Sequence, residues 1–316
     1  MLLSTLKLIR INNIAFIALF QVIVRYCIVL PILALHNIEP MLSDVRFVML
    51  IAATMLIAAG GNVINDYFDV TTDKINRPTR VVVDKHLDRR TAILIHVVLT
   101  LIGVFIGLYL SFVFRKENYA LLFIAVPIVL LFYSTTFKKK MLVGNLIVAM
   151  LTALTALLVV SVEFAALAHY NGAALTDSLA SKQAWFFTSA FAFYAFLSNL
   201  IREIIKDMED IEGDNAVGCT TLPIEMGTKY SKIIVILLEC FMLTTLCAAL
   251  FFAEPSICTT AQGFVVLTAI ALPTLVGMYM LIKAQTNRQY HRVSTLCKVV
   301  MLIGTLSIVY LYYIHH

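Results

Sequence analysis

Long apolar stretches recur along the whole chain and leave few folds open to it. A helix that crosses the hydrocarbon core of a bilayer needs about 20 consecutive, mainly apolar residues. Nine segments of the sequence meet this requirement: 14–36, 46–66, 91–113, 119–137, 142–168, 184–205, 233–253, 261–283 and 296–314. Only 14% of the 316 residues are charged, against about 25% in soluble domains, so a soluble globular fold is excluded. The sequence predicts an all-α, multi-pass membrane protein with nine transmembrane helices, formed as a single domain over residues 1–316.

The lysines and arginines lie mainly in alternate connections between these segments. If the N-terminus is cytoplasmic, 19 of the 24 basic residues fall on the cytoplasmic side. The opposite side then holds only Arg46, Arg115, Lys116 and Lys182. Because cytoplasmic loops are enriched in Lys and Arg, this distribution predicts a cytoplasmic N-terminus and a C-terminus on the opposite side. The remaining residue, Arg25, lies inside the first segment, where it either serves a functional site or extends toward the outer interface.

A short acidic stretch, NDYFDVTTD (65–73), follows the second apolar segment on the predicted cytoplasmic side. It carries Asp66, Asp69 and Asp73. Offsets of three and four residues place side chains on one face of a helix, so these carboxylates form one stripe if the helix continues.

The same spacing recurs in KDMEDIEGD (206–214), after the sixth apolar segment. Here the three carboxylates are Asp207, Asp210 and Asp214. Both stretches lie at the predicted cytoplasmic end of an even-numbered segment. The recurrence of the pattern at equivalent positions indicates a pseudo-repeat within the domain.

Two acidic stripes that face each other repel strongly unless a cation lies between them. Hard oxygen ligands suit Mg²⁺, which keeps some waters and bridges carboxylates to substrate phosphates. The six aspartates are therefore candidate metal ligands, and Asn62 or Asn65 can join the first stripe. The alternative is that both stretches are merely solvated helix ends.

Basic residues on the same side can neutralise the remaining charge of a phosphate. Arg binds phosphate oxygens bidentately, and Lys acts as a point charge. The candidates for substrate binding, including the tyrosine of YSTTFKKK, are Arg77, Tyr133, Lys138, Arg202 and Lys206. Arg10 and Asn13, at the start of the first apolar segment, either contact a substrate head group or anchor the helix. The expected partners are an anionic ligand and membrane lipid, and no nucleic acid.

Three stretches of the sequence resemble signatures of the UbiA superfamily of intramembrane prenyltransferases. NDYFDVTTDKINRPTR is similar to the first aspartate-rich signature of this family, and REIIKDMEDIEGDNAVGCTTLPIEMG is similar to the second. YSTTFK resembles the family's Tyr-to-Lys element after the fourth helix. With the nine-segment count, the resemblance covers nearly the whole chain.

The resemblance implies a bundle of nine helices around a central cavity that is open to the lipid. It implies that Mg²⁺ grips the diphosphate of an isoprenyl donor and that an acceptor captures the allylic carbocation. By position, the residues that carry the metal would be Asn65, Asp66, Asp69, Asp73, Asp207, Asp210 and Asp214, and the six aspartates among them would be the catalytic residues. Those that hold the diphosphate would be Arg77, Lys138, Arg202 and Lys206.

Within the family, REIIKDMEDIEGD followed by TTLPI looks most like the branch that makes digeranylgeranylglyceryl phosphate. This resemblance implies a geranylgeranyl donor, a prenylated glycerol phosphate as lipid acceptor and an ether-lipid product. An aromatic acceptor, as in quinone biosynthesis, is the alternative. The sequence departs from the family's usual continuation at Val81, in NRPTRVVVDKH, which bears on the acceptor.

Two other classes of membrane protein are alternatives to this interpretation. CDP-alcohol phosphotransferases are also rich in aspartate, but neither acidic stretch is preceded by their DG and AR elements. A cation transporter would place its carboxylates near the bilayer midplane, often at interrupted helices. Both acidic stretches lie instead at helix ends among Arg and Lys, which favours an anionic ligand with its metal.

Overall fold

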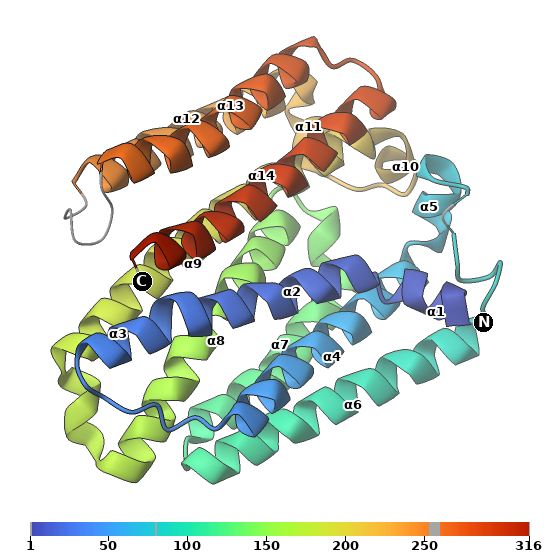
Figure 1. Ribbon diagram of the computed structural model, residues 1–316. Helices are drawn as coiled ribbons and strands as arrows, with labels where there is room; N and C mark the ends of the chain where they lie inside the picture. The colour runs from blue at the N-terminus through green and yellow to red at the C-terminus, as the bar shows by residue number, and fades with distance from the viewer. Residues whose placement is uncertain (1, 80, 253–259, 316) are drawn as a thin grey trace. The chain divides into compact units, whose positions relative to one another are not determined.

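The computed structural model describes residues 2–79, 81–252 and 260–315, and within them every regular element is a helix (Figure 1). Arg80, a basic residue after the first acidic stretch, lies outside the described residues. Nine of the described helical stretches are long and apolar enough to cross a membrane: Ile11–Leu35, Asp44–Phe68, Arg89–Phe114, Glu117–Thr135, Val143–Asn171, Leu179–Glu209, Gly227–Phe251, Ala261–Lys283 and Asn287–Ile314. The predicted all-α fold with nine spans is therefore confirmed.

The chain divides into two compact units. The N-terminal unit comprises residues 1–139 and 154–190, and the C-terminal unit comprises residues 140–153 and 191–316. The first acidic stretch belongs to the N-terminal unit and the second to the C-terminal unit. Each unit is described by itself.

The N-terminal unit is built around helix α4, which carries the first acidic stretch and packs against α2, α6 and α7. The α-helices that lie wholly in this unit are α1 (Leu2–Leu8), α2 (Ile11–Val24), α3 (Leu30–Leu35), α4 (Asp44–Phe68), α5 (Val70–Asn76), α6 (Arg89–Phe114) and α7 (Glu117–Thr135). It also contains a π-helical segment, η1 (Arg25–Val29), and two short 3₁₀ segments, η2 (Phe137–Lys139) and η3 (Ala173–Asp177). Figure 1 shows α4 and α6 running side by side.

In the C-terminal unit, α13 packs against both α12 and α14. The α-helices that lie wholly in this unit are α10 (Ile211–Ala216), α11 (Leu222–Glu225), α12 (Gly227–Phe251), α13 (Thr260–Lys283) and α14 (Asn287–His315). Two long helices contribute residues to both units, α8 (Val143–Asn171) and α9 (Leu179–Glu209). The core of the unit is formed by residues of α9 such as Ile204, Ile205 and Met208, which are fully buried.

Several helices extend beyond the apolar segments that predict them. The sequence predicts the sixth span at 184–205, and α9 continues to Glu209. The ninth is predicted at 296–314, and α14 begins at Asn287. Helical hydrogen bonding does not stop where the apolar run stops, so polar residues continue the helix. The second acidic stretch therefore begins on the last turn of α9.

Glycines allow the close approach of α4 and α6. A Cβ atom at Gly60 would lie against the hydroxyl of Thr100, and one at Gly103 would lie 3.0 Å from the carbonyl oxygen of Ala53. Small residues at such contacts let neighbouring backbones approach in a membrane helix pair. This close pair holds the helix that ends at the first acidic stretch.

Arg25 lies in the interior of the N-terminal unit, with only 2% of its surface exposed. Its guanidinium donates to the carbonyl oxygen of Leu42, and its Nε lies 3.7 Å from Oε2 of Glu163. Oε1 of Glu163 accepts from the backbone N–H groups of Met41 and Leu42, both at 3.0 Å. The buried pair thus ties the connection between α3 and α4 to α8. Arg25 Nη1 also lies 3.3 Å from Oδ1 of the exposed Asp44, so the guanidinium extends toward this connection, which the sequence predicts to lie on the side opposite the first acidic stretch.

Candidate active site

The backbone of the first acidic stretch bends at its middle aspartate. Helix α4 ends at Phe68, α5 begins at Val70, and Asp69 lies between them with φ −85° and ψ 0°. The N–H of Asp69 donates to the carbonyl of Asn65 at 2.9 Å, and the N–H of Asp73 donates to the carbonyl of Asp69 at 2.8 Å. The helical hydrogen-bond spacing therefore persists although the helix does not continue unbroken.

The second acidic stretch bends at the corresponding residue. Helix α9 ends at Glu209, α10 begins at Ile211, and Asp210 lies between them with φ −101° and ψ 8°. Its N–H donates to the carbonyl of Lys206 at 2.9 Å, and the N–H of Asp214 donates to the carbonyl of Asp210 at 3.1 Å. The correspondence between the two stretches thus extends from sequence spacing to backbone geometry.

Basic side chains neutralise two carboxylates of the first stretch. Arg10 Nη2 lies 2.6 Å from Oδ1 of Asp66, and Lys138 forms an ion pair with Asp69. The Asn65 amide donates to Oδ2 of Asp69 at 2.6 Å. Lys138 reaches this group from η2, and Arg10 reaches it from the junction of α1 and α2. Five residues predicted for the site therefore meet in the N-terminal unit.

Asp73 lies close enough to Asp66 and Asp69 for their negative charges to act on its carboxyl group. Burial, and after it the negative charges of Asp69 and Asp66, raise the pKa of the Asp73 carboxyl from 3.8 to about 6. Arg10 and Arg77 oppose this rise. For Arg10 itself, the Asp66 carboxylate raises the pKa above its ordinary value. The carboxylates of the stretch and its basic neighbours therefore act on one another's ionisation.

Asp73→Asn is expected to stabilise the protein at pH 7 when no divalent cation is present. Because the folded-state pKa is raised, the stability linked to Asp73 is present below its ordinary pKa and is lost as pH rises through about 6. The gain from removing the carboxylate is about 1–2 kcal/mol, after allowance for partial exposure. Thermal unfolding in detergent at pH 4 and pH 7 checks this prediction. The unfolding temperature of Asp73→Asn should exceed that of the wild type only at pH 7, and an equal increase at both pH values would contradict the prediction.

In the C-terminal unit, an amide and a second carboxylate organise the charged groups. Oδ2 of Asp207 accepts from the Asn145 amide at 2.8 Å. Arg202 forms an ion pair with Glu203, and Lys206 Nζ lies 3.0 Å from the other carboxylate oxygen of Glu203. The predicted substrate-binding residues Arg202 and Lys206 are thus brought together by Glu203.

The other predicted substrate-binding residues differ in how close they lie to the charged groups of the site. Arg77 and Tyr133 lie close enough to act electrostatically on Asp73 and Arg10, respectively. Asn13 is exposed on the first turn of α2. Asn145 was not among the predicted site residues, and an amide at the start of an apolar run was the only sequence signal for it.

The donor set fits Mg²⁺ by its chemistry, because carboxylate and amide oxygens are the hard ligands that this ion prefers. Among residues 2–79, 81–252 and 260–315, no three His, Cys, Asp or Glu side chains lie close enough together to hold a metal ion. Instead Arg10 and Lys138 neutralise Asp66 and Asp69. These two basic side chains therefore occupy the carboxylates that a divalent cation would neutralise.

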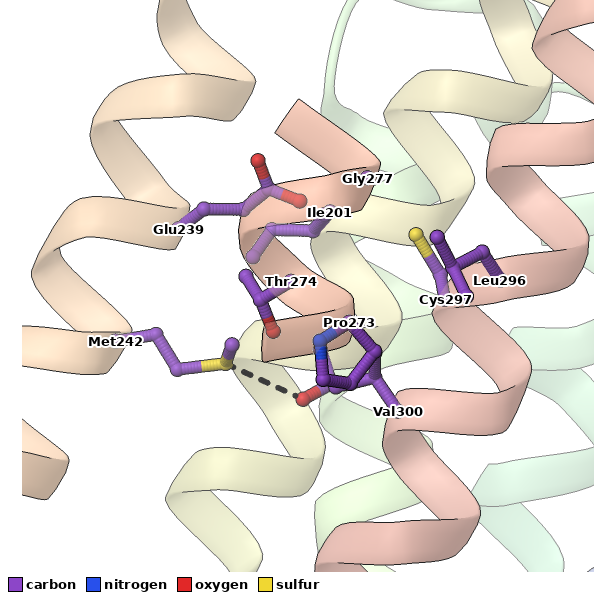
Figure 2. A pocket seen from close by; sticks show the side chains of 10 residues that line it. Ile201, Glu239, Met242, Pro273, Thr274, Gly277, Leu296, Cys297 and Val300 are labelled. Carbon is purple, nitrogen blue, oxygen red and sulfur yellow. Dashed lines mark hydrogen bonds between the residues drawn. The ribbon is translucent and has the colours of Figure 1, made fainter. Parts of the chain in front are cut away.

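A separate narrow pocket lies in the C-terminal unit among α9, α12, α13 and α14 (Figure 2). It has about 20 Å³ of space, room for one water-sized group, and none of the six aspartates lines it. Figure 2 shows Glu239 and Cys297 on its wall. Glu239 is 3% exposed, and its Oε2 has no hydrogen-bond partner in the part of the chain that the structure describes.

Glu239→Met is expected to raise the thermal stability of the protein in detergent. A buried polar group without a partner costs about 1–3 kcal/mol, and methionine of similar length removes that cost. Glu163→Met is the matched comparison, because Glu163 is equally buried but accepts two backbone hydrogen bonds. It should lower the unfolding temperature, and a stabilising Glu163→Met with a destabilising Glu239→Met would contradict this account.

Comparison with known proteins connects this arrangement to one family. Residues 27–306 match the model of the UbiA prenyltransferase family. The chain is similar to the digeranylgeranylglyceryl phosphate synthase of Methanothermobacter thermautotrophicus, with 32% identity over 257 residues, 81% of this chain and 82% of the relative. The synthase of Thermococcus kodakarensis is 30% identical over 264 residues, 82% of this chain and 83% of that protein.

The fold is also found among solved structures. A UbiA homologue from Archaeoglobus fulgidus, bound to GPP and Mg²⁺, superposes with a TM-score of 0.59 over 97% of this chain and 99% of that one. The two are 15% identical, so this likeness concerns the fold alone. With nine candidate membrane spans in its described residues, two matched aspartate stretches and a family match over most of its length, this chain belongs to the UbiA prenyltransferase family.

Proposed function

We propose that this prenyltransferase transfers a geranylgeranyl group from geranylgeranyl diphosphate to the hydroxyl of geranylgeranylglyceryl phosphate, forming an ether lipid. Two observations support this choice of substrates. The curated relatives named above are digeranylgeranylglyceryl phosphate synthases. The sequence around the second acidic stretch, REIIKDMEDIEGD followed by TTLPI, resembles the corresponding sequence of that branch.

We also propose that both acidic stretches act on the same diphosphate through Mg²⁺. The residues that would hold the metal are Asn65, Asp66, Asp69, Asp73, Asp207, Asp210 and Asp214. When bound, Mg²⁺ supplies positive charge that stabilises the departing diphosphate. Support comes from the A. fulgidus homologue, which binds an isoprenyl diphosphate together with Mg²⁺.

The basic residues of each unit would bind the diphosphate oxygens. Lys138 and Arg10 are already held at the first stretch by Asp69 and Asp66. Arg202 and Lys206 are held beside the second stretch by Glu203. Because these side chains are preorganised by carboxylates, little ordering is required when the substrate arrives.

In the transfer step, the bond between C1 of the isoprenyl group and the diphosphate oxygen breaks, and the electron pair leaves with diphosphate. The acceptor hydroxyl oxygen forms a new bond to C1 and releases its proton. Positive charge develops on the isoprenyl carbon and negative charge on the diphosphate. The basic side chains act on the second of these charges.

The observation that carries this proposal is the shared bend at Asp69 and Asp210. In both stretches the middle aspartate lies between two helices with nearly the same backbone angles. A solvated helix end requires no such correspondence, whereas two half-sites for one ligand do. The basic residues at both stretches further indicate an anionic ligand.

The proposed orientation places the N-terminus and the mouth of the active site in the cytoplasm, and the C-terminus on the opposite side. The excess of Lys and Arg in alternate connections supports it. In this arrangement, residues 1–316 act as one catalytic domain, with the two stretches as its pseudo-repeated halves.

The test uses purified protein in detergent with radiolabelled geranylgeranyl diphosphate and Mg²⁺. Geranylgeranylglyceryl phosphate and 4-hydroxybenzoate are supplied as competing acceptors in the same reaction. We expect label in the ether lipid and its loss when EDTA removes the metal. Exclusive labelling of the aromatic acceptor would reject the ether-lipid assignment but leave the prenyltransferase intact.

A further inference from the structure

Arg10 has a backbone conformation that residues with a side chain rarely adopt. It lies between α1 and α2 with φ 55° and ψ 56°, in the left-handed region. This conformation is disfavoured for residues that carry a Cβ atom, and it persists only where the surroundings hold it. At Arg10 it coincides with an ion pair to Asp66 at 2.6 Å.

Contacts on α4 hold the residues directly before Arg10. The Asn62 amide donates to the backbone carbonyl of Ile9 at 2.9 Å. Leu8 is fully buried and packs in the same core as Val63. Two consecutive residues are therefore attached to α4, one by a hydrogen bond and one by packing.

Asn62 and Asp66 are four residues apart, so they lie on the same face of α4, one turn from each other. The amide of the first holds the backbone before Arg10, and the carboxylate of the second receives its guanidinium. Arg10 is thus held at both its backbone and its side chain by one face of one helix.

We propose that Asn62 is a positioning residue for the transferase reaction. Its amide holds the Ile9 carbonyl, keeps Arg10 in the left-handed conformation and so directs the guanidinium to the first acidic stretch. This inference rests on the proposed function, because it assigns Arg10 to the charge balance of the diphosphate site. It adds a residue that touches neither substrate nor metal.

The chemistry of the contact requires a donor at position 62. A backbone carbonyl can only accept, so an amide N–H suits it and a carboxylate does not. Asn62→Asp preserves shape and removes the donor, whereas Asn62→Ala removes both. Should side-chain volume alone matter, Asn62→Asp would behave as the wild type.

Limited trypsin digestion of the detergent-solubilised protein tests the positioning without any reference to activity. Trypsin cleaves after Arg and Lys, and the hold on Arg10 should protect the bond that follows it. We expect both Asn62 variants to be cleaved after Arg10 about 10-fold faster, because losing a hydrogen bond worth about 1.4 kcal/mol raises the population of the opened segment about 10-fold. Mass spectrometry of the N-terminal peptide identifies the cut.

Thr54→Val is the matched control for a lost hydrogen bond between α2 and α4. The Thr54 hydroxyl donates to Oε1 of Gln21 at 2.8 Å, also joining these helices, and valine keeps its shape. It should leave cleavage after Arg10 unchanged. Equal cleavage rates in the wild type and both Asn62 variants would overturn the positioning role.

A double-mutant cycle then separates positioning from a merely structural contact. We expect kcat/KM for the isoprenyl diphosphate to fall about 10-fold in Asn62→Ala and about 100-fold in Arg10→Ala. The double variant should lose no more than Arg10→Ala, because Asn62 acts through Arg10. Losses that multiply would show independent roles and overturn the proposal.

The two assays also separate this inference from the proposed function. A wild-type protein that transfers no isoprenyl group would reject the function, whereas the digestion would still report the hold on Arg10. Active wild-type protein with unchanged kcat/KM in both Asn62 variants would reject the positioning role alone.

Discussion

Replacing Asp69 or Asp210 with alanine is expected to lower Mg²⁺-dependent isoprenyl transfer by at least about 10³-fold. Each residue lies at the bend of its acidic stretch, where one side chain is placed between two helices. In the proposed site both carboxylates help hold the metal that stabilises the departing diphosphate. Loss of either would leave one half of the site without its central ligand. The measurement is the transfer rate of each purified variant with saturating donor and acceptor.

Matched controls lie within the same two stretches. Thr71 and Glu212 are exposed neighbours that lie off the aspartate positions. Their alanine variants should retain activity near that of the wild type and so exclude general disruption of the stretch. Full activity of either aspartate variant would reject the two-stretch metal site, since one half would then suffice.

Lys138→Met is expected to lower the turnover number by about 100-fold while Mg²⁺ binding in the absence of substrate becomes no weaker. Lys138 forms an ion pair with Asp69 and approaches Asn65 Oδ1 at 3.4 Å. Without substrate it competes with a metal for these oxygens, so its removal favours metal binding. During the reaction its charge is needed by the diphosphate, so turnover falls. Titration with Mn²⁺ by electron paramagnetic resonance, together with kinetics, measures both effects.

Lys140→Met serves as the control because Lys140 is an exposed member of the same basic run. This variant should change neither the turnover number nor the binding of Mg²⁺ in the absence of substrate. A Lys138→Met variant with weakened metal binding and normal turnover would contradict the proposed role, because it would make the lysine a support of the metal ligands alone.

The membrane fold could be predicted because hydrocarbon thickness sets the length of an apolar helix. The first acidic stretch was likewise visible, because Asp66, Asp69 and Asp73 repeat the spacing of the second. Helical offsets indicated that these side chains would lie together, and the structure places Asp66 and Asp69 beside the basic residues Arg10 and Lys138.

The contacts that shape the site depend on packing between distant parts of the chain, which spacing does not encode. Nothing in the local sequence around Asn145 indicates that it contacts Asp207, 62 residues away. Similarly, Arg25 could be recognised as costly in a membrane, but its partner Glu163 lies on another helix. The bends at Asp69 and Asp210 occur without proline or glycine at either position, so no helix-breaking residue in the sequence predicts where the helix ends.

The most direct measurement is calorimetric titration of a non-reacting analogue, geranylgeranyl thiodiphosphate, into the wild type, Asp69→Ala and Asp210→Ala, each with and without Mg²⁺. If both acidic stretches grip one diphosphate through the metal, the wild type binds one analogue per chain only with Mg²⁺, and each variant loses that metal-dependent affinity. Binding of the analogue by either variant with wild-type affinity and wild-type dependence on Mg²⁺ would contradict the account.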